Sequence, residues 1–172
     1  LEGLVNAQIR PQVMGYLLRQ NYKDGSFVKK GELMFEIDPR TFRAALDQAK
    51  GQLANAEQQL AQAEANQVKA QLDVNRYVPL AKEQAVTQQD LDNAVQANLA
   101  AQAQVRAAKG QSDAAKAQVD AAQLNLGFTK VVSLIDGIAG IAQAQIGDLV
   151  GPTSLLTTVS TVDPIKVYFP VS

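Results

Sequence analysis

The alternation of apolar and polar positions divides the chain into three parts. In the first part, Asp24-Gly25 and Lys30-Gly31 separate short apolar runs at 4–9, 15–18, 26–28 and 33–37. Short runs between glycine-containing turns are typical of β-strands. The same signals return after Gly127, at 129–132, 138–144, 149–150, 155–159 and 165–171. We therefore predict β-structure on both sides of a middle segment that has a different period.

The middle segment repeats its seam residues every three or four positions. Its first series is Phe42, Leu46, Ala49, Leu53, Ala56, Leu60, Ala63, Gln67, Ala70, Val74 and Tyr77. Its second series is Leu91, Ala94, Asn98, Ala101, Val105, Ala108, Ser112, Ala115, Val119, Ala122 and Leu126. A period of 3.5 residues over about five heptads is the signature of a coiled-coil seam. The two series predict two helices of matched length with an alanine-rich seam.

The ends of these helices carry capping signals. Asp38 can cap a helix N-terminus, and Pro39 suits its first position, where no amide donor is needed. The first series stops in residues 76–86, which contain Pro79, and Gly127 suits a C-terminal cap after the second. Each helix would span about 36 residues, or about 54 Å, with a connection of about ten residues. The product is an antiparallel hairpin of modest stability, because alanine buries little area.

The two β segments share an internal repeat. In the first segment, Val13-Met14-Gly15 is followed ten residues later by Gly25-Ser26-Phe27-Val28. In the second, Ile135-Asp136-Gly137 is followed ten residues later by Gly147-Asp148-Leu149-Val150. A repeat of this kind indicates two similar half-motifs. We expect the halves to combine in one small β-sandwich, with the hairpin inserted between them. The glycines of this unit, Gly15, Gly25, Gly31, Gly137 and Gly147, are expected to occupy turns with positive φ.

The composition excludes several classes of function. The 172 residues contain no Cys and no His, which removes thiol nucleophiles, imidazole bases and the usual zinc ligands. The net charge of −1 gives no basic field for nucleic acid or anionic lipid. Two carboxylate pairs, Asp90 with Asp92 and Asp136 with Asp148, have no convincing partner base or phosphate loop. We therefore expect no catalytic residues, no metal site and no cofactor.

The chain contains no apolar run near the roughly 20 residues that span a bilayer, and it opens without a signal segment. Its abrupt start and its end after a strand-like run favour a fragment of a longer protein. We expect any membrane anchor to lie in parts absent from this chain.

Residues 25–33 resemble a turn-and-strand signature of lipoyl or biotinyl carrier domains; their sequence is Gly-Ser-Phe-Val-Lys-Lys-Gly-Glu-Leu. A carrier function is therefore one alternative. Carrier domains present a modified lysine at the turn that joins their halves, but that region here reads Phe35-Glu36-Ile37-Asp38-Pro39 and then becomes helical. Lys29 and Lys30 lie too early in the chain, and we interpret them as solvated turn residues.

A lipoyl-like domain split by a helical hairpin resembles the membrane fusion proteins of the HlyD-like adaptor family. The resemblance to adaptors of resistance-nodulation-division (RND) pumps is carried by segments at 15–18, 35–40, 124–129, 136–140 and 163–167. The implied fold class is α+β: a long antiparallel coiled-coil hairpin inserted between two halves of a lipoyl/biotinyl-like β-sandwich. The implied domains are a first half-sandwich at 1–38, a hairpin at 39–126 with its tip at about 76–87, a second half-sandwich at 127–162 and the start of a β-barrel domain at 163–172.

The hairpin tip carries the residues that the resemblance connects with a partner. The family has an Arg, a Leu four residues later and a Ser eleven residues later, and this chain has Arg76, Leu80 and Thr87. Thr87 keeps the hydroxyl but adds a methyl group. Without the resemblance, Thr87 to Asp90 is typical of a capping box, Arg76 of a solvated helix end and Leu80 of a turn residue.

The resemblance implies a structural adaptor in the periplasm of a Gram-negative bacterium, attached to the inner membrane. It would link an inner-membrane RND transporter to a TolC-type outer-membrane channel in a tripartite multidrug efflux pump, and would self-associate as a ring, a hexamer by resemblance. An adaptor of an ABC exporter or of a type I secretion system is the alternative within the family. Exposed glutamines such as Gln58, Gln62, Gln96, Gln104 and Gln118 are solubilising residues or, in an adaptor, line contacts between hairpins.

Overall fold

The computed structural model describes residues 2–3, 5–161 and 165–166 of the chain. Its contacts divide it into a β unit, residues 1–44 and 123–172, and a helical unit, residues 45–122. The two units are described separately.

Ten short strands form three sheets within the described part of the β unit. One four-stranded sheet has the order β2 (Asn6–Ile9), β9 (Thr157–Ser160), β7 (Gly137–Ala139) and β4 (Phe27–Val28). The other has the order β6 (Lys130–Val132), β5 (Leu33–Ile37), β3 (Gly15–Gln20) and β8 (Leu149–Val150). A third sheet pairs β1 (Glu2–Gly3) with β10 (Ile165–Lys166). Every strand pairing is antiparallel.

The two halves of the chain build each sheet together. The strand order of one four-stranded sheet becomes that of the other when four pairs of strands are exchanged: β2 with β6, β3 with β7, β4 with β8 and β5 with β9. The topology therefore has the internal two-fold relation that the sequence repeat predicts. The expected single sandwich, with one half from each side of the hairpin, is confirmed.

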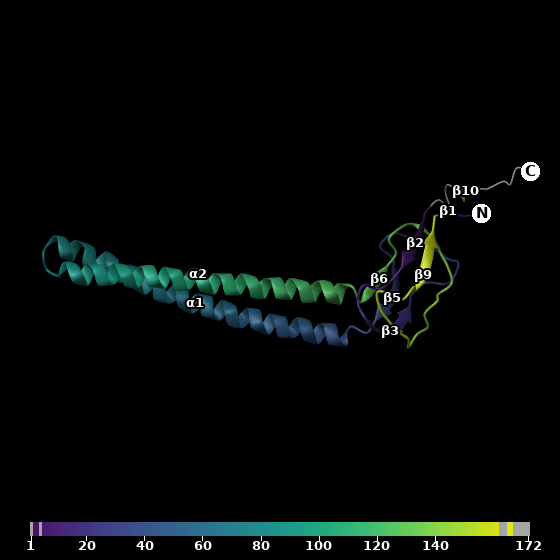
Figure 1. Ribbon diagram of the computed structural model, residues 1–172, viewed down its shortest axis with the longest axis horizontal. Helices are drawn as coiled ribbons and strands as arrows, with labels where there is room; N and C mark the ends of the chain where they lie inside the picture. Colours follow the sequence, from purple (N-terminus) through teal and green to yellow (C-terminus); the bar gives the residue numbers. More distant parts are fainter. Residues whose placement is uncertain (1, 4, 162–164, 167–172) are drawn as a thin grey trace, which may run out of the picture. The chain divides into compact units, whose positions relative to one another are not determined.

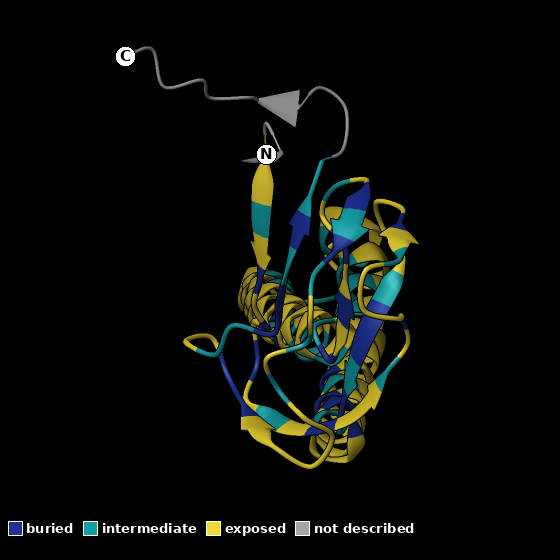
Figure 2. Cartoon of the chain, turned by 90° about the vertical axis from the view of Figure 1, so that its right-hand side faces the viewer, coloured by how far each residue is buried: buried dark blue, intermediate teal, exposed yellow. Residues whose placement is uncertain are grey.

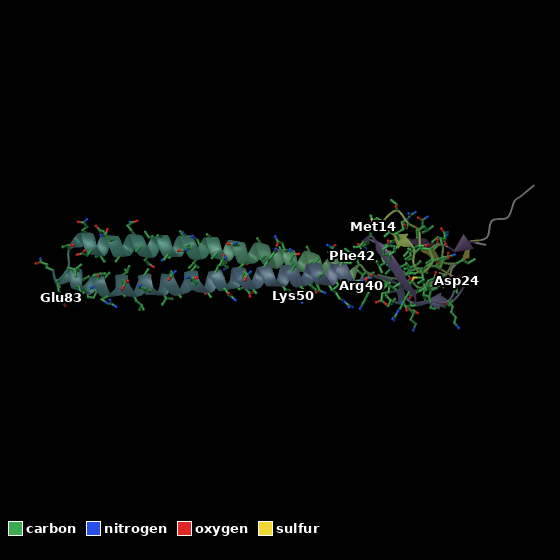
Figure 3. The ribbon with its side chains drawn as sticks, turned by 90° about the horizontal axis from the view of Figure 1, so that it is seen from below. Met14, Asp24, Arg40, Phe42, Lys50 and Glu83 are labelled. Carbon is green, nitrogen blue, oxygen red and sulfur yellow. The ribbon has the colours of Figure 1, made fainter. Side chains whose placement is uncertain are left out.

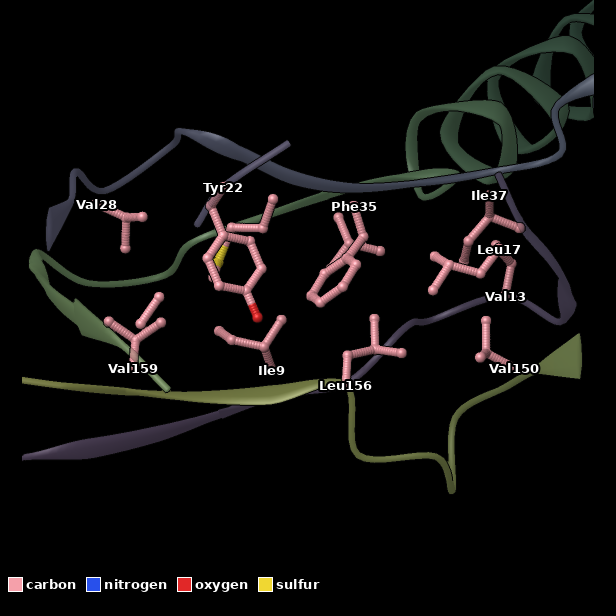
Figure 4. Packing of buried hydrophobic residues seen from close by; sticks show 13 residues of the cluster. Ile9, Val13, Leu17, Tyr22, Val28, Phe35, Ile37, Val150, Leu156 and Val159 are labelled. Atoms are coloured by element: carbon pink, nitrogen blue, oxygen red, sulfur yellow. The ribbon is translucent and has the colours of Figure 1, made fainter. Parts of the chain in front are cut away.

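The core between the two sheets draws on both halves (Figure 4). The first half contributes Ile9, Val13, Leu17, Tyr22, Val28, Met34, Phe35 and Ile37, and the second contributes Val131, Ala139, Val150, Leu156 and Val159. Tyr22 and Phe35 meet edge to face with ring centroids 5.3 Å apart, a favoured aromatic geometry. Neither half could bury this surface alone.

The glycines of the β unit have two different roles. Gly25, Gly31 and Gly147 have positive φ, at 77°, 84° and 99°, as expected. The expectation is wrong for Gly15 and Gly137, which are not among the positive-φ residues. A Cβ on Gly15 would lie 2.6 Å from Cγ2 of Ile37, and a Cβ on Gly137 would collide with the Ser160 carbonyl. These two glycines are needed because neighbouring groups pack directly against their backbone.

One predicted strand differs from the structure, and another lies largely outside the described residues. The run predicted at 138–144 forms a strand only over Gly137–Ala139, after which Gly140 and Gln143 donate to the carbonyls of Thr158 and Leu156 as irregular chain. Of the predicted barrel strand at 163–172, only Ile165–Lys166 is described, as β10. Residues 163–164 and 167–172, including most of the motif at 163–167, lie outside the described residues.

Two long helices follow each other between β5 and β6: α1 (Arg40–Lys82, 43 residues) and α2 (Gln88–Gly127, 40 residues). The predicted start is confirmed, because Asp38 Oδ1 accepts the Arg40 amide at 3.0 Å and the Pro39 carbonyl accepts the Arg43 amide at 2.8 Å. The predicted ends are wrong. α1 continues through Pro79 to Lys82, and Gly127 is the last helical residue and does not have positive φ.

The helices run side by side in opposite directions (Figure 1), and the predicted seam is confirmed. Every residue of both heptad series is buried or half-buried, and most other helix positions are exposed (Figure 2). The two series match position by position when the second is followed backwards along the chain. Ala70 then corresponds to Asn98 and Val74 to Ala94, and the two residue numbers of each such pair add to 168. The hydrogen bond from Asn98 Nδ2 to Gln71 Oε1, 2.8 Å, agrees with this register.

Candidate partner-binding site at the hairpin tip

The tip of the hairpin is a tight turn of five residues, 83–87, between α1 and α2. The Ala85 amide donates to the Leu80 carbonyl at 2.8 Å, and the Gln84 amide donates to the Ala81 carbonyl at 3.1 Å. This pair of bonds is the Schellman motif that ends many helices. Gln84 occupies its left-handed position with φ of 57°, which glycine usually fills. Figure 3 places Glu83 at this closed end.

Thr87 starts α2 with a reciprocal capping box. Its hydroxyl accepts the Asp90 amide at 3.1 Å and donates to Asp90 Oδ2 at 2.5 Å, and its own amide donates to the same oxygen at 3.1 Å. This arrangement satisfies amides that the first helical turn would otherwise leave unpaired. The capping prediction for Thr87 is confirmed.

Arg76 and Leu80 lie one turn apart on α1, because residues four positions apart share a helix face. The Arg76 side chain is 69% exposed, and its nearest acid is Asp73 in the turn before, at 3.6 Å. Leu80 is half-buried, and its carbonyl is the acceptor that closes the Schellman motif. The tip therefore carries an accessible guanidinium, an aliphatic side chain and the hydroxyl that caps α2, which are groups that can contact another protein.

Hydrogen bonds shift the titration of one acid in the tip. The Thr87 hydroxyl, and after it the Thr87 amide, lower the pKa of Asp90 below its ordinary value. These hydrogen bonds favour the ionised carboxylate, which is the form that holds the cap. A negative charge in the first turn of α2 also interacts favourably with the helix dipole.

A furrow of about 500 Å³ lies between the helices next to the tip. It is lined by Asn66, Lys69, Ala70, Asp73, Tyr77, Asp90, Asn93, Ala94, Ala97 and Ala101. The lining combines four alanines with polar and charged residues and Tyr77. This furrow was not predicted from the sequence, although the alanines of the heptad series were a signal for it.

A second feature missed at the sequence level lies in the seam below the tip. Asn98 is buried, with 8% of its surface exposed, and its Oδ1 has no hydrogen-bond partner among the described residues. Its Nδ2 is paired with Gln71. The heptad series identified Asn98 as a seam residue, but its pairing with Gln71 could be known only from the register of the two helices.

The other candidate groups have local structural roles. Asp136 accepts the Lys30 amide at 2.7 Å and so links the two halves of the β unit, whereas Asp148 accepts the Gln145 amide at 2.8 Å and closes its own turn. The Lys29 amide donates to Glu32 in a further turn. In the described parts of the chain, no cluster of three or more His, Cys, Asp or Glu residues could hold a metal ion. None of the described helices is both long and apolar enough to cross a membrane.

Comparison with known proteins gives consistent matches. The sequence model described as "RND MFP, alpha-helical hairpin domain" matches residues 45–129. The chain is 42% identical over 163 residues to the multidrug efflux pump subunit AcrA of Escherichia coli K12, which covers 94% of this chain and 38% of AcrA. It is 38% identical over 169 residues to the efflux pump periplasmic linker BepD of Brucella suis, covering 95% of this chain and 38% of BepD. The chain thus spans less than half the length of these relatives.

Among solved structures, MacA from Actinobacillus actinomycetemcomitans has a similar fold. The TM-score is 0.81 at 26% identity, and the match covers 94% of this chain and 54% of the MacA chain. This similarity supports the α+β fold of a split β unit with a helical hairpin.

Proposed function

Because this chain belongs to the membrane fusion protein family and carries its RND-type helical hairpin, we propose that it is a periplasmic adaptor of a tripartite multidrug efflux pump. In this proposal it links an inner-membrane RND transporter to a TolC-type outer-membrane channel. The tip residues Arg76, Leu80 and Thr87 contact the channel. Members of this family are adaptors, and the chain is not an enzyme.

The observation that carries the proposal is the geometry of the tip. The turn separates Arg76 and Leu80 from Thr87 in sequence, but the Schellman motif and the capping box hold this turn in one shape. A fixed turn can present side chains to a partner with little loss of conformational entropy. The exposed Arg76 supplies a charged donor, and Leu80 supplies apolar area beside it.

The continuous hairpin supports a connecting role. α1 has 43 residues and α2 has 40, so each helix extends about 60 Å at 1.5 Å per residue. Such a hairpin can carry a contact surface about 60 Å from its own base. In the proposed pump, copies of the chain form a ring, by resemblance a hexamer, on the periplasmic side of the inner membrane.

Site-specific crosslinking in the native host tests this function. A photoreactive residue at Leu80 or Thr87 should capture an outer-membrane channel, identified by mass spectrometry. The same residue at Ala54, in the half of α1 away from the tip, serves as the control and should capture no channel. Arg76→Glu should reduce the capture from Leu80, because it reverses the charge offered to the channel. Equal capture of the channel from Ala54 and from the tip would contradict the assignment of the site.

The alternatives predict different captured or modified species. An adaptor of an ABC exporter or a type I secretion system would copurify with a transporter of that class instead of an RND transporter. A carrier domain would show lipoylation or biotinylation of Lys29 or Lys30 in the intact mass of the protein isolated from its host.

A further inference from the structure

A pocket of about 250 Å³ lies at one edge of the β-sandwich. Its lining comes from both halves of the chain: from β2 and the residues that follow it, and from β6 and its flanking residues. β2 and β6 are edge strands of the two four-stranded sheets, so no further described strand continues either sheet at this place. The volume is just below the roughly 300 Å³ at which typical ligand pockets begin, so the pocket suits a small ligand.

The apolar part of the lining continues from the core of the sandwich. Ile9 and Val131 belong to the core, and Phe128 packs against it. Val132 and Leu134 extend the apolar lining to the surface, with 36% and 59% of their area exposed. An apolar group that replaces water beside these side chains gains hydrophobic free energy.

The Arg10 guanidinium, which also lines the pocket, is held by neutral acceptors. Its Nη1 donates to the Thr153 carbonyl at 2.6 Å, and its Nε and Nη2 donate to Gln8 Oε1 at 3.4 and 3.1 Å. A guanidinium has five N–H groups, so two of them have no acceptor within the described part of the chain. Three hydrogen bonds thus orient Arg10 and leave its charge without a counter-ion.

Lys130, the first residue of β6, is the second cation of the lining, and none of the lining residues is acidic. The ion pairs found among the described residues include neither Arg10 nor Lys130. The pocket therefore combines uncompensated positive charge with apolar surface. A carboxylate complements such a site, because its oxygens accept strong charge-assisted hydrogen bonds from arginine.

We propose that this pocket binds a small amphipathic carboxylate. The carboxylate is held by Arg10 and Lys130, and the apolar body of the ligand packs against Phe128, Val132 and Leu134. A medium-chain fatty acid and a free aromatic carboxylate share this chemistry. The site lies entirely within the β unit, so it is independent of the channel contact proposed for the hairpin tip.

Titration of the whole chain with octanoate, followed by nuclear magnetic resonance and calorimetry, tests the site. Octanoate should bind once per chain and should shift backbone amide signals within residues 8–12 and 128–134. It should bind at least about tenfold more tightly than octanol, which has no charge to pair with Arg10. Acetate should bind at least roughly tenfold more weakly than octanoate, because it has no apolar body to bury. Naphthoate used in place of octanoate distinguishes a flat aromatic ligand from an alkyl chain.

Three substitutions assign the binding to this pocket. Arg10→Met keeps an unbranched side chain without the charge and should weaken octanoate binding about tenfold or more. Arg19→Met is the matched control, since Arg19 is an exposed cation of β3 outside the pocket; it should change the affinity by no more than about twofold. Leu134→Asp changes an exposed residue and places a negative charge in the lining, so it should abolish octanoate binding in a folded protein even if Arg10→Met loosens the chain at Thr153.

Four results would overturn the proposal. Equal affinities for octanoate and octanol would indicate a purely apolar occupant. Equal losses in the Arg10 and Arg19 variants would indicate a diffuse charge effect. Signal shifts within residues 45–122 in place of the β unit would locate the binding on the hairpin, and no binding of octanoate at millimolar concentration would refute the site itself.

Discussion

Thr87 and Asp90 hold the turn at the tip of the hairpin through three hydrogen bonds between their hydroxyl, carboxylate and amide groups. The residue expected to contact a partner is thus also the residue that starts α2. A hydroxyl at position 87 therefore determines the shape of the tip, and any contact that it makes depends on that shape. Substitutions at Thr87 can separate the two roles.

Thr87→Ala should destabilise the hairpin by about 1 kcal/mol, because the N-cap acceptor is lost. Thr87→Ser and Thr87→Asn keep a capping side chain and should retain stability close to that of the native protein. Thermal unfolding followed by circular dichroism measures this order. Channel capture from Leu80 should survive in the Ser variant. If it also survives in the Asn variant, Thr87 acts through the cap, and if it is lost there, Thr87 contacts the channel directly.

Gln84→Gly should stabilise the chain by up to about 1 kcal/mol, since a glycine has no steric cost in the left-handed conformation that Gln84 adopts. Gln84→Val should have the opposite effect, because a β-branched residue is least compatible with positive φ. Urea unfolding of the three proteins gives the comparison. A glycine variant less stable than the native protein would contradict the assignment of Gln84 to the Schellman position.

Asp38 should make stability depend on pH in the acid range. The Arg40 side chain, and then its amide, lower the pKa of Asp38 from 3.8 to about 2. A lowered folded-state pKa stabilises the fold above pH 3.8, and this contribution is lost as the pH falls toward 2. Unfolding measured between about pH 5 and pH 2 should therefore show that Asp38→Asn loses less stability on acidification than the native protein does. Identical pH profiles would contradict a role for the Asp38 charge.

Gly15→Ala and Gly137→Ala should each destabilise the β unit by about 1–3 kcal/mol, because the added methyl group meets Ile37 or the Ser160 carbonyl. Gly127→Ala is the matched control. It lies in the last turn of α2 with open space where a Cβ would be, and alanine favours a helix by up to about 1 kcal/mol. A loss of stability in the Gly127 variant would favour a C-terminal cap there after all.

Asn98→Leu should raise stability, because it removes from the seam a buried carbonyl oxygen that has no hydrogen-bond partner among the described residues. Its counterpart in the mirrored register is Ala70, which leaves room for a larger side chain. The midpoint of thermal unfolding should increase. A decrease would mean that the bond to Gln71 outweighs the unpaired oxygen.

The extent to which sequence predicted this structure depends on the range of the interactions. The heptad series located the seam residue by residue, because helix periodicity is local and extends over many turns. The cap at Asp38 was equally local. Pro79 was misleading, because a proline near an exposed helix end loses only one hydrogen bond: Asn75 and Pro79 are both exposed, so solvent can satisfy the freed carbonyl.

Features that depend on tertiary contacts were not predictable in the same way. Gly15 and Gly137 resemble turn glycines in sequence, and only their neighbours across the sandwich reveal the close backbone packing. The left-handed Gln84 had no signal, because glutamine is an unusual residue for that conformation. At the tip, the spacing of Arg76, Leu80 and Thr87 identified the candidate residues, and the structure added the bonds that hold the turn.

Drug resistance of the native host tests the central claim most directly. In the native gene, codons 76–87 are replaced by an unrelated turn of the same length, and protein abundance is measured alongside the minimal inhibitory concentrations of pump substrates. The proposed role of the tip predicts that resistance falls to the level of a strain lacking the gene while the protein remains abundant. Full resistance with the replaced tip would contradict channel coupling through Arg76, Leu80 and Thr87.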